Sequence, residues 1–562
     1  MTPPLTDRRA FMAFCGSLGL GSTLLPGVLW ARLADGADIS AATIACAEEL
    51  AGVHFEDEQR EQMVDGLRRQ AGQLEALHAV SLPNAVAPAL VFNPVPAGTS
   101  IEGAQRPPVR GAVTAPAVPG NLEELAFRPL TELGELVRTR QVTCTQLTRM
   151  YLARLERYDP MLHCVVTLTP ERALAQAAEM DAELARGRYR GPLHGIPWGA
   201  KDLLAVKGYP TTWGAEPFRT QTFDEDATVV QRLDSAGAVL VAKLTLGALA
   251  MGDVWFGGRT RNPWNIEQGS SGSSAGSASA TAAGLVGFAI GSETLGSISS
   301  PSTRCGVTGL RPTFGRVART GAMALSWSMD KLGPLTRGVE DAALVLAAIQ
   351  GPDGVDRTVH AAPFNWDATL APSQLRVGYF SSVFERDYAQ KATDQATLDV
   401  LRTLGAKLIP VEIPDLPYQA MSPILNAEAA ASFDELTRSG RDKLLTEQGP
   451  NAWPNSFRTA RFIPAVDYLN ANRLRTLAMD RWAELMSTVD VIVTPTGGSS
   501  QLLATNLTGH PAVIVPNGFR DDGTPVSITF LGGLFEEAKP LALANAYQNA
   551  TDWHRRHPSL KG

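Results

Sequence analysis

The stretch GSSGSSAGSASATAAGLVGFAIGSETLGSISSP, residues 269–301, decides how this chain folds. It is rich in Ser, Gly and Ala and nearly free of charge. A flexible linker has a similar composition, but a linker has no reason to carry the apolar run from Leu285 to Ile290. That run is bounded by glycines and predicts a buried strand. The small residues before it predict a tightly packed helix, or a loop whose backbone approaches another segment closely.

Composition bounds the class of protein. The 562 residues are 44% hydrophobic and 19% charged, which predicts a globular chain with a sizeable core. The formal net charge of −7 leaves no basic footprint for nucleic acid. The five cysteines are scattered and have no CxxC spacing, so the sequence supports neither a disulfide framework nor a zinc site.

The N-terminus has the pattern of an export signal. Two adjacent arginines, Arg8 and Arg9, precede Phe11 and an uncharged stretch over residues 13–31. This order is typical of a twin-arginine signal, although a short tail with chance arginines is the alternative. We therefore expect residues 1–37 to direct export in folded form to a periplasm.

Two further segments precede the main body. Apolar residues recur at helical steps between residues 39 and 80, at Met63, Leu67, Leu74 and Leu77, and predict an amphipathic helical hairpin. We assign residues 38–82 to this helical extension. Prolines crowd residues 83–120 and predict an extended connector along the surface. We assign residues 121–562 to the main body of the chain.

In the main body, helical patterns alternate with short apolar strands. Thr143 and Gln146 form a capping-box signature for a helix that we expect to end at Pro160. The alternation predicts an α/β body around a central sheet. Residues 358–485 are more polar, and we expect irregular insertions there that shape the substrate entrance.

A serine in the central stretch needs a base before it can act as a nucleophile. No histidine occurs between His194 and His360. The letters of a nucleophile elbow fit residues 272–276, which centre on Ser274, but the residues before them read as a turn instead of a strand. A buried, neutral lysine is the other possible base. Lys201 follows the uncharged segment 195–200, and its alternative role is a surface lysine paired with Asp202.

Several separated motifs resemble the amidase signature family. They span about residues 121–555 in the family's order and comprise Gly191–Asp202, Ser271–Ser277, Gly291–Ile298, Cys305–Arg316, Lys331–Pro334 and Thr508–Val513. The resemblance implies an α/β fold whose central sheet is mixed and mostly parallel, with helices on both faces. The helical N-terminal extension would be added to this fold.

The resemblance also implies a Ser–Ser–Lys triad. Ser297 matches the nucleophile, Ser273 the bridging serine with a cis peptide bond, and Lys201 the base. The backbone N–H groups of Thr294, Leu295, Gly296 and Ser297 would form the oxyanion hole. Neither a metal nor a cofactor is implied.

Four positions depart from the family's common pattern. Ser271 and Leu295 each replace a glycine, Glu293 replaces a frequent Asp, and Ser299 stands where an Arg is often found. The triad is unaffected, but the loss of that Arg weakens the resemblance to glutamine-dependent amidotransferases. Leu295 places an apolar group beside the oxyanion site and favours an apolar or aromatic substrate.

The leading hypothesis is therefore a hydrolase of small-molecule carboxylic amides, with esters, anilides or carbamates as further substrates. The alternatives are a catalytically inert binding protein on the same fold and a glutamine-dependent amidotransferase subunit of the A type. Met251, Trp255 and Trp327 are candidates for lining the pocket, although such residues more often belong to a core. We expect a monomer or homodimer that binds neither nucleic acid nor, after export, a membrane.

Overall fold

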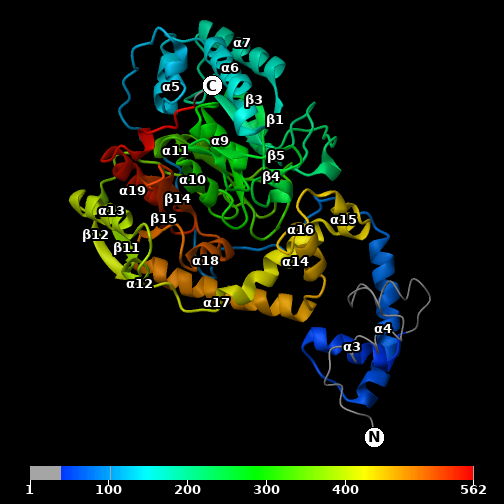
Figure 1. Cartoon of the computed structure of the whole chain (residues 1–562). Coiled ribbons are helices and arrows are strands. Elements are labelled where there is room, and N and C mark those ends of the chain that lie inside the picture. Colours follow the sequence, from blue (N-terminus) through cyan, green and yellow to red (C-terminus); the bar gives the residue numbers. More distant parts are fainter. Residues whose placement is uncertain (1–38, 102, 561–562) are drawn as a thin grey trace.

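The computed structural model of the chain describes residues 39–101 and 103–560 (Figure 1). The predicted export signal lies outside these residues. The helices are α3 (Ala41–Ala51), α4 (Asp57–His78), α5 (Leu130–Arg138), α6 (Cys144–Leu162), α7 (Pro170–Ala185), α8 (Thr228–Ser235), α9 (Ala275–Ala282), α10 (Ser299–Cys305), α11 (Val339–Ile349), α12 (Ser381–Glu385), α13 (Lys391–Thr403), α14 (Ser422–Ser432), α15 (Asp434–Arg438), α16 (Trp453–Ala460), α17 (Ala465–Thr488), α18 (Gln501–Thr508) and α19 (Ala538–Asn549).

An 11-stranded sheet forms the centre, in the order β1-β3-β2-β8-β10-β9-β14-β15-β13-β11-β12. Its strands are β1 (Val165–Leu168), β2 (Pro197–Lys201), β3 (Val239–Leu244), β8 (Phe288–Glu293), β9 (Thr308–Arg311), β10 (Lys331–Thr336), β11 (Arg376–Phe380), β12 (Lys407–Val411), β13 (Val491–Pro495), β14 (Ala512–Phe519) and β15 (Pro525–Gly532). Two short hairpins lie outside it, made of β4 (Val254–Trp255) with β5 (Gly258–Arg259) and β6 (Arg261–Asn262) with β7 (Asn265–Gly269).

The mixed α/β architecture that the sequence predicts is confirmed. Parallel pairs form two blocks, β3-β2-β8 and β13-β11-β12. The remaining neighbours in the sheet pair antiparallel, so parallel pairing is confined to these blocks.

Helices cover both faces of the sheet. Successive strand residues point to opposite faces, and neighbours on β9 contact different helices. The Thr308 hydroxyl accepts a hydrogen bond from Gln548 of α19 at 2.9 Å. A Cβ at Gly309 would lie 2.2 Å from the Ser302 hydroxyl of α10. Helices α10 and α19 therefore lie on opposite faces.

The central stretch folds as predicted, with a shift in one boundary. The small residues form the buried helix α9, and a buried strand follows it. That strand, β8, covers residues 288–293, whereas the apolar run predicted a strand over residues 285–290. Leu285 still belongs to the end of the helix, because its N–H donates to the carbonyl of Ala280.

Two other predictions need correction. The capping box of Thr143 and Gln146 is present, but α6 continues through Pro160 to Leu162. The proline removes a backbone hydrogen bond, and the packing of the buried residues Tyr158 and Leu162 around it offsets that loss. The segment 358–485 is not irregular, since helices α12–α17 and strands β11 and β12 occupy most of it. Many of its polar residues face solvent on these helices, but others, such as Glu428 and Arg475, are buried.

The predicted N-terminal helices are present as α3 and α4, which Figure 1 shows projecting from the body beside α15. Met63, Val64 and Leu67 pack in a small cluster with Ile39 and Ile44, but Leu77, predicted on the same face, is 52% exposed. Over residues 83–101 and 103–120 the chain forms no regular helix or strand, as the prolines predict. None of the described helices is long and apolar enough to span a membrane.

Candidate active site

Lys201 and Ser292 meet at one edge of the sheet. Lys201 is the last residue of β2, and Ser292 lies near the end of β8, its parallel neighbour. The carboxyl ends of parallel strands open at the same edge, where α/β proteins place their sites. The stretch that follows β8 carries the residues of the predicted oxyanion hole and Ser297.

The Lys201 amine is surrounded by hydroxyl groups. Its Nζ lies 2.7 Å from Ser273 Oγ, 2.9 Å from Ser292 Oγ and 3.1 Å from Ser274 Oγ. The side chain is fully buried. Burial lowers the pKa of Lys201 well below its usual range, and the charges of Asp330 and Glu293 offset only part of this effect. An amine in this environment is suited to act as a base.

Ser273 and Ser274 stand just before α9. The Gly272–Ser273 peptide bond is cis, as the family resemblance implies. Gly272 is packed so closely that a Cβ would lie 1.8 Å from the carbonyl oxygen of Gly252. Ser274 donates to the Ser292 carbonyl and accepts from its N–H, both at 3.1 Å, so its hydroxyl links α9 to β8.

The elbow interpretation of Ser274 is partly revised. A strand, β7, does precede the motif, contrary to the turn that the sequence predicts. Ser274 is nevertheless bonded to Lys201 and to β8, and no histidine within the described residues forms a hydrogen bond with it. Its environment is that of a structural hydroxyl beside the lysine.

Ser297 lies in the turn between β8 and α10, with 9% of the residue exposed. Its carbonyl accepts the Ser274 N–H at 3.1 Å, which fixes the turn next to the Lys201 cluster. Gly296 has φ 86°, a conformation that other residues rarely adopt. No hydrogen bond joins the hydroxyls of Ser297 and Ser273 among the described residues. The structure therefore places the two serines in adjacent segments, and their catalytic roles stay a prediction.

Four backbone donors in this turn have no acceptor. Within residues 39–101 and 103–560, no protein group accepts a hydrogen bond from the N–H of Thr294, Leu295, Gly296 or Ser297, the residues predicted to form the oxyanion hole. Free, neighbouring N–H groups are what an oxyanion hole requires. Leu295 itself is 38% exposed, so its apolar side chain lies at the mouth of this turn.

Glu293 is a buried carboxylate whose importance the sequence did not reveal. One oxygen accepts the N–H groups of Ile298 and Ser299 at 2.9 and 2.8 Å and the Ser299 hydroxyl at 2.9 Å. The other accepts from Arg311 and Asn506, each at 2.9 Å. Burial alone would raise the pKa of Glu293, but these partners and Lys331 lower it to about 2. Glu293 thus holds both sides of the Ser297 turn as a permanent charge.

Asp330 holds the same turn from the opposite side. Its carboxylate accepts the Thr294 hydroxyl at 2.5 Å and the N–H groups of Leu325 and Ser326 at 2.8 and 2.9 Å. Trp327 lies in the loop closed by these bonds, half-buried, and its buried indole N–H has no partner among the described residues. This loop, residues 324–330, is called the Trp327 loop below.

The other predicted pocket residues lie on a segment beside Gly272. Asp253 accepts the Ser271 N–H at 2.9 Å, so the segment that carries Met251 and Trp255 contacts the residues before Ser273. Met251 is half-buried. Trp255 is buried and packs against Phe256. Their role in binding substrate stays a prediction.

Sequence reasoning missed three polar residues of this site, Ser292, Glu293 and Asp330, and it considered Ser274 only as a candidate nucleophile. Ser292 looked like an ordinary small residue of a Ser-rich stretch. Glu293 did carry a signal, since it is the one charge within residues 269–301. A lone charge in a buried stretch needs partners, and that requirement could have identified it as a structural ion.

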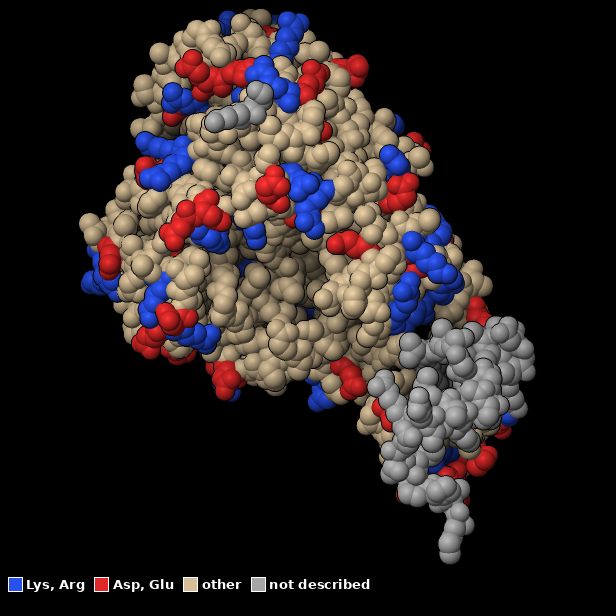
Figure 2. All heavy atoms as spheres, in the orientation of Figure 1, with Lys and Arg blue, Asp and Glu red and all other residues tan. Residues whose placement is uncertain are grey.

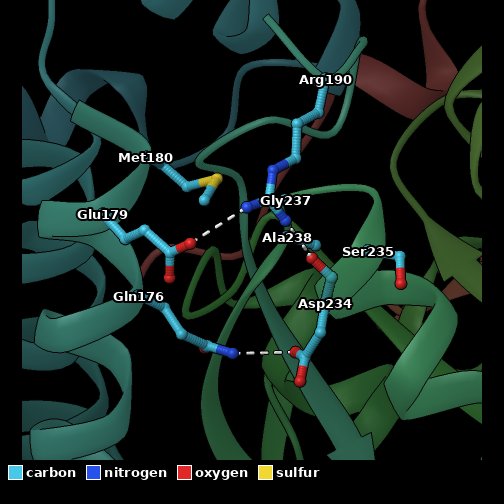
Figure 3. Close-up of a pocket in the computed structure, with 8 residues that line it drawn as sticks. All are labelled: Gln176, Glu179, Met180, Arg190, Asp234, Ser235, Gly237 and Ala238. Carbon is cyan, nitrogen blue, oxygen red and sulfur yellow. Dashed lines mark hydrogen bonds and ion pairs between the residues drawn. The ribbon is translucent and has the colours of Figure 1, made fainter. Parts of the chain in front are cut away.

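Figure 2 shows that the face in view is hollowed near its middle, over α18 and the loops drawn green in Figure 1. A separate cleft lies between α7 and α8 (Figure 3), lined by Gln176, Glu179, Met180, Arg190, Asp234, Ser235, Gly237 and Ala238. None of the predicted catalytic residues lines it. Its polar groups are paired with one another, because Arg190 bonds Glu179 and the Asp234 carbonyl, and Gln176 bonds the Asp234 carboxylate. These polar groups are therefore already engaged with one another and are not available to a ligand.

In the described part of the chain, no group of three or more His, Cys, Asp or Glu side chains is arranged to hold a metal ion.

Comparison with known proteins identifies the family of this arrangement. The family model described as Amidase matches residues 146–504. The A subunit of the glutamyl-tRNA(Gln) amidotransferase from Methylococcus capsulatus is 34% identical over 480 residues, which cover 77% of this chain and 99% of the relative.

Solved structures resemble the chain over a similar length. The native peptide amidase of Stenotrophomonas maltophilia has a TM-score of 0.69 and 31% identity, over 78% of this chain and 99% of that one. A bacterial aryl acylamidase of the amidase signature enzymes has a TM-score of 0.67 over 76% of this chain and 97% of that one. At 23% identity, this last likeness supports the fold alone.

Proposed function

Because this chain belongs to the amidase signature family, we propose that it cleaves the C–N bond of a carboxamide through an acyl-enzyme on Ser297. One observation carries the proposal. The amine of Lys201, fully buried and without a hydrogen-bonded carboxylate among the described residues, lies 2.7 Å from the hydroxyl of Ser273. A neutral amine beside a serine relay is the base that this chemistry needs.

The hydroxyl contacts of Lys201 suit a neutral amine, which has two N–H donors and one lone pair. The Ser274 proton is directed to the Ser292 carbonyl, so Ser274 accepts from Lys201. The lone pair is then free for Ser273, the nearest hydroxyl. Lys201 is thereby poised to remove the Ser273 proton.

In the reaction, Lys201 takes the proton of Ser273, and Ser273 takes the proton of Ser297. The Ser297 oxygen bonds to the substrate carbonyl carbon, and the carbonyl oxygen becomes an anion held by the free N–H groups of residues 294–297. The relay then returns a proton to the nitrogen, the C–N bond breaks, and the amine leaves. Water attacks the acyl-Ser297 by the same route and releases the carboxylic acid.

We propose a hydrolase that acts on apolar or aromatic amides. Residues 294–297 are called the oxyanion turn below. Leu295, exposed at the mouth of this turn, favours an apolar acyl or leaving group over a small polar one such as glutamine. Esters, anilides and carbamates that fit the same pocket would also react, because their carbonyl groups are attacked in the same way.

A second candidate function is the glutamine-dependent step of an amidotransferase. The 34% identity to the A subunit of a glutamyl-tRNA(Gln) amidotransferase favours it. Against it stands Ser299, which replaces the Arg common in such proteins. The Ser299 hydroxyl donates to Glu293, so this position offers no cation for the carboxylate of a free amino acid.

Labelling with a small fluorophosphonate tests the shared chemistry without a known substrate. We expect one adduct on Ser297 in the intact mass and peptide map, and its loss in Lys201→Ala. An adduct on Ser274 would point to the elbow, and the lack of any adduct would contradict the acyl-enzyme.

Two assays then separate the candidates. A hydrolase releases p-nitroaniline from aryl amides and ignores glutamine, whereas a component of an amidotransferase releases ammonia from glutamine and co-purifies with its partners from the native host. Clear preference for glutamine would replace the hydrolase proposal with the second candidate.

We also propose export through the twin-arginine pattern of Arg8 and Arg9, on the evidence of the sequence alone. A reporter fused to residues 1–37 should reach the periplasm and stay in the cytoplasm when both arginines are changed to Lys. Cytoplasmic retention of the unchanged fusion would contradict export.

A further inference from the structure

The Pro-rich connector contacts the loop beside the candidate active site at Asn84. The connector lies outside the residues that the Amidase family model matches. Most residues around Asn84 are exposed, but Asn84 is half-buried. Its carboxamide pairs with both backbone groups of Ala324: Nδ2 donates to the Ala324 carbonyl, and Oδ1 accepts the Ala324 N–H, each at 2.8 Å. A two-point pairing of this kind fixes a backbone segment as a neighbouring strand would.

Ala324 is the first residue of the Trp327 loop. From there the loop runs to Asp330, which bonds Leu325, Ser326 and the Thr294 hydroxyl of the oxyanion turn. Asn84 is therefore connected to the oxyanion turn through one short loop.

The far side of the loop is held by α14. Glu428 accepts the hydroxyls of Ser326 and Ser328 at 2.6 and 2.7 Å, on either side of Trp327. Asn84 also contacts the end of this helix, because Nδ2 lies 3.5 Å from the Ser432 carbonyl. The Ser432 hydroxyl in turn donates to the Leu325 carbonyl. The connector thus joins loop and helix at one point.

A second connector residue acts on the other end of the loop. The Arg475 guanidinium donates to the Ser328 carbonyl and to its hydroxyl, both at 2.8 Å. The Cζ atom of Arg475 lies 3.4 Å from the centroid of the Phe92 ring, which covers the guanidinium. The Phe92 ring also packs edge-on against Phe314, with 5.1 Å between the two ring centroids. Phe92 covers a buried cation that would otherwise need water or another partner. Figure 1 shows the blue connector passing from α4 beside α15 and on toward α18.

We propose that connector residues Asn84 and Phe92 are positioning residues of the active site. They fix the Trp327 loop at Ala324 and Ser328, and through Asp330 they set the position of Thr294 and the oxyanion turn. This inference rests on the proposed function, because the turn it positions is the one that would stabilise the anion on the substrate.

The test uses the full chain and a small fluorophosphonate. Asn84→Ala removes both bonds to Ala324, and we expect the maximal labelling rate of Ser297 to fall about tenfold as the oxyanion donors shift. The concentration that gives half the maximal rate should change little, since a small probe does not reach Trp327. Asn84→Asp keeps the acceptor for the Ala324 N–H and should lose less. Phe92→Leu should reproduce the effect from the other end of the loop.

A matched control comes from the same connector. Asn93 is exposed, and its Oδ1 accepts only the N–H of Val95. Asn93→Ala should therefore label as the wild type does.

Hydrogen exchange gives a second readout that does not need activity. In Asn84→Ala, the amides of Leu325 and Ser326, which bond Asp330, should exchange faster along with that of Ala324. Faster exchange at Ala324 with unchanged labelling of Ser297 would overturn the inference and leave Asn84 a purely structural contact. Lack of labelling in the wild type would contradict the proposed function. Even in that case, unchanged exchange at Leu325 and Ser326 in Asn84→Ala would contradict the inference that Asn84 positions the Trp327 loop.

Discussion

The Glu293 carboxylate lies 2.9 Å from the Arg311 guanidinium, and neither side chain is exposed to solvent. The other oxygen of the same carboxylate accepts the first N–H groups of α10. One buried ion pair therefore connects β9, the end of β8 and the helix that follows Ser297. The geometry of the proposed nucleophile depends on this pair, since among the described residues no other charged side chain bonds the backbone of this turn.

Glu293→Gln should damage both stability and catalysis. The amide leaves Arg311 with a buried, uncompensated charge. An amide oxygen is also a weaker acceptor than a carboxylate oxygen for the N–H groups of Ile298 and Ser299. We expect a loss of about 3 kcal/mol in the free energy of unfolding and a fall of about 100-fold in the labelling rate of Ser297. Urea unfolding and fluorophosphonate labelling measure the two effects.

The exposed residue Glu156 provides the control, because Glu156→Gln makes the same chemical change on the surface of α6. Labelling of Glu293→Gln at the wild-type rate would mean that the turn holds its shape without the ion pair.

Lys201→Met should abolish labelling and yet make the fold more stable. The folded-state pKa of Lys201 lies well below 10.5, because burial disfavours the charged amine. The unfolded chain therefore binds a proton that the folded chain lacks, at every pH between these two pKa values. Wild-type stability then falls as pH decreases, by about 1.4 kcal/mol per pKa unit of depression.

The stability gap between Lys201→Met and wild type should accordingly be small above pH 10.5, widen as pH falls, and become constant below the folded-state pKa. Unfolding in urea at a series of pH values measures it. Because the base must be neutral, wild-type activity should rise with pH through the lowered folded-state pKa of Lys201. A stability gap that does not depend on pH would contradict a neutral, buried lysine.

Ser274→Ala tests whether the second serine supports the base. Its hydroxyl links Lys201 to both backbone groups of Ser292. Without it, these buried groups lose their partner, and we expect a loss of about 2 kcal/mol in stability and of about tenfold in labelling rate, with the adduct still on Ser297. Ser279→Ala is the control, because Ser279 is buried on α9, the helix that follows Ser274, and within the described residues its hydroxyl bonds only the Arg261 carbonyl. Complete loss of labelling would instead assign Ser274 the role of nucleophile.

The sequence predicted the parts of this protein that follow local rules. Lys201 stands out because an uncharged segment leads to it, and the helix start at Thr143 follows from its capping box. The partners of Glu293 could not be read in the same way, since Arg311 and Asn506 join it only when distant strands and α18 meet. The prolines of the connector predicted an extended chain correctly. Nothing in them indicated that Asn84 pairs with Ala324, a contact across 240 residues.

Trp327→Ala tests which substrates the site accepts. The indole is half-buried in a loop that Glu428 and Asp330 hold on both sides, so it presents a fixed apolar surface near the oxyanion turn. Loss of this surface should weaken binding of aromatic substrates without changing the chemistry at Ser297. For aryl anilides we expect KM to rise about tenfold with kcat nearly constant, as for the loss of uniform binding energy.

A series of p-nitroanilides with acyl groups of increasing size measures this effect. The smallest member should react equally with both enzymes, and Trp327→Phe should restore most of the affinity for the largest, because a phenyl ring keeps the flat apolar surface. Trp553→Ala, at a half-buried tryptophan near the C-terminus that stacks on Arg556, should leave all constants unchanged. If instead kcat falls for every substrate and KM stays constant, Trp327 supports the oxyanion turn and does not line the substrate pocket.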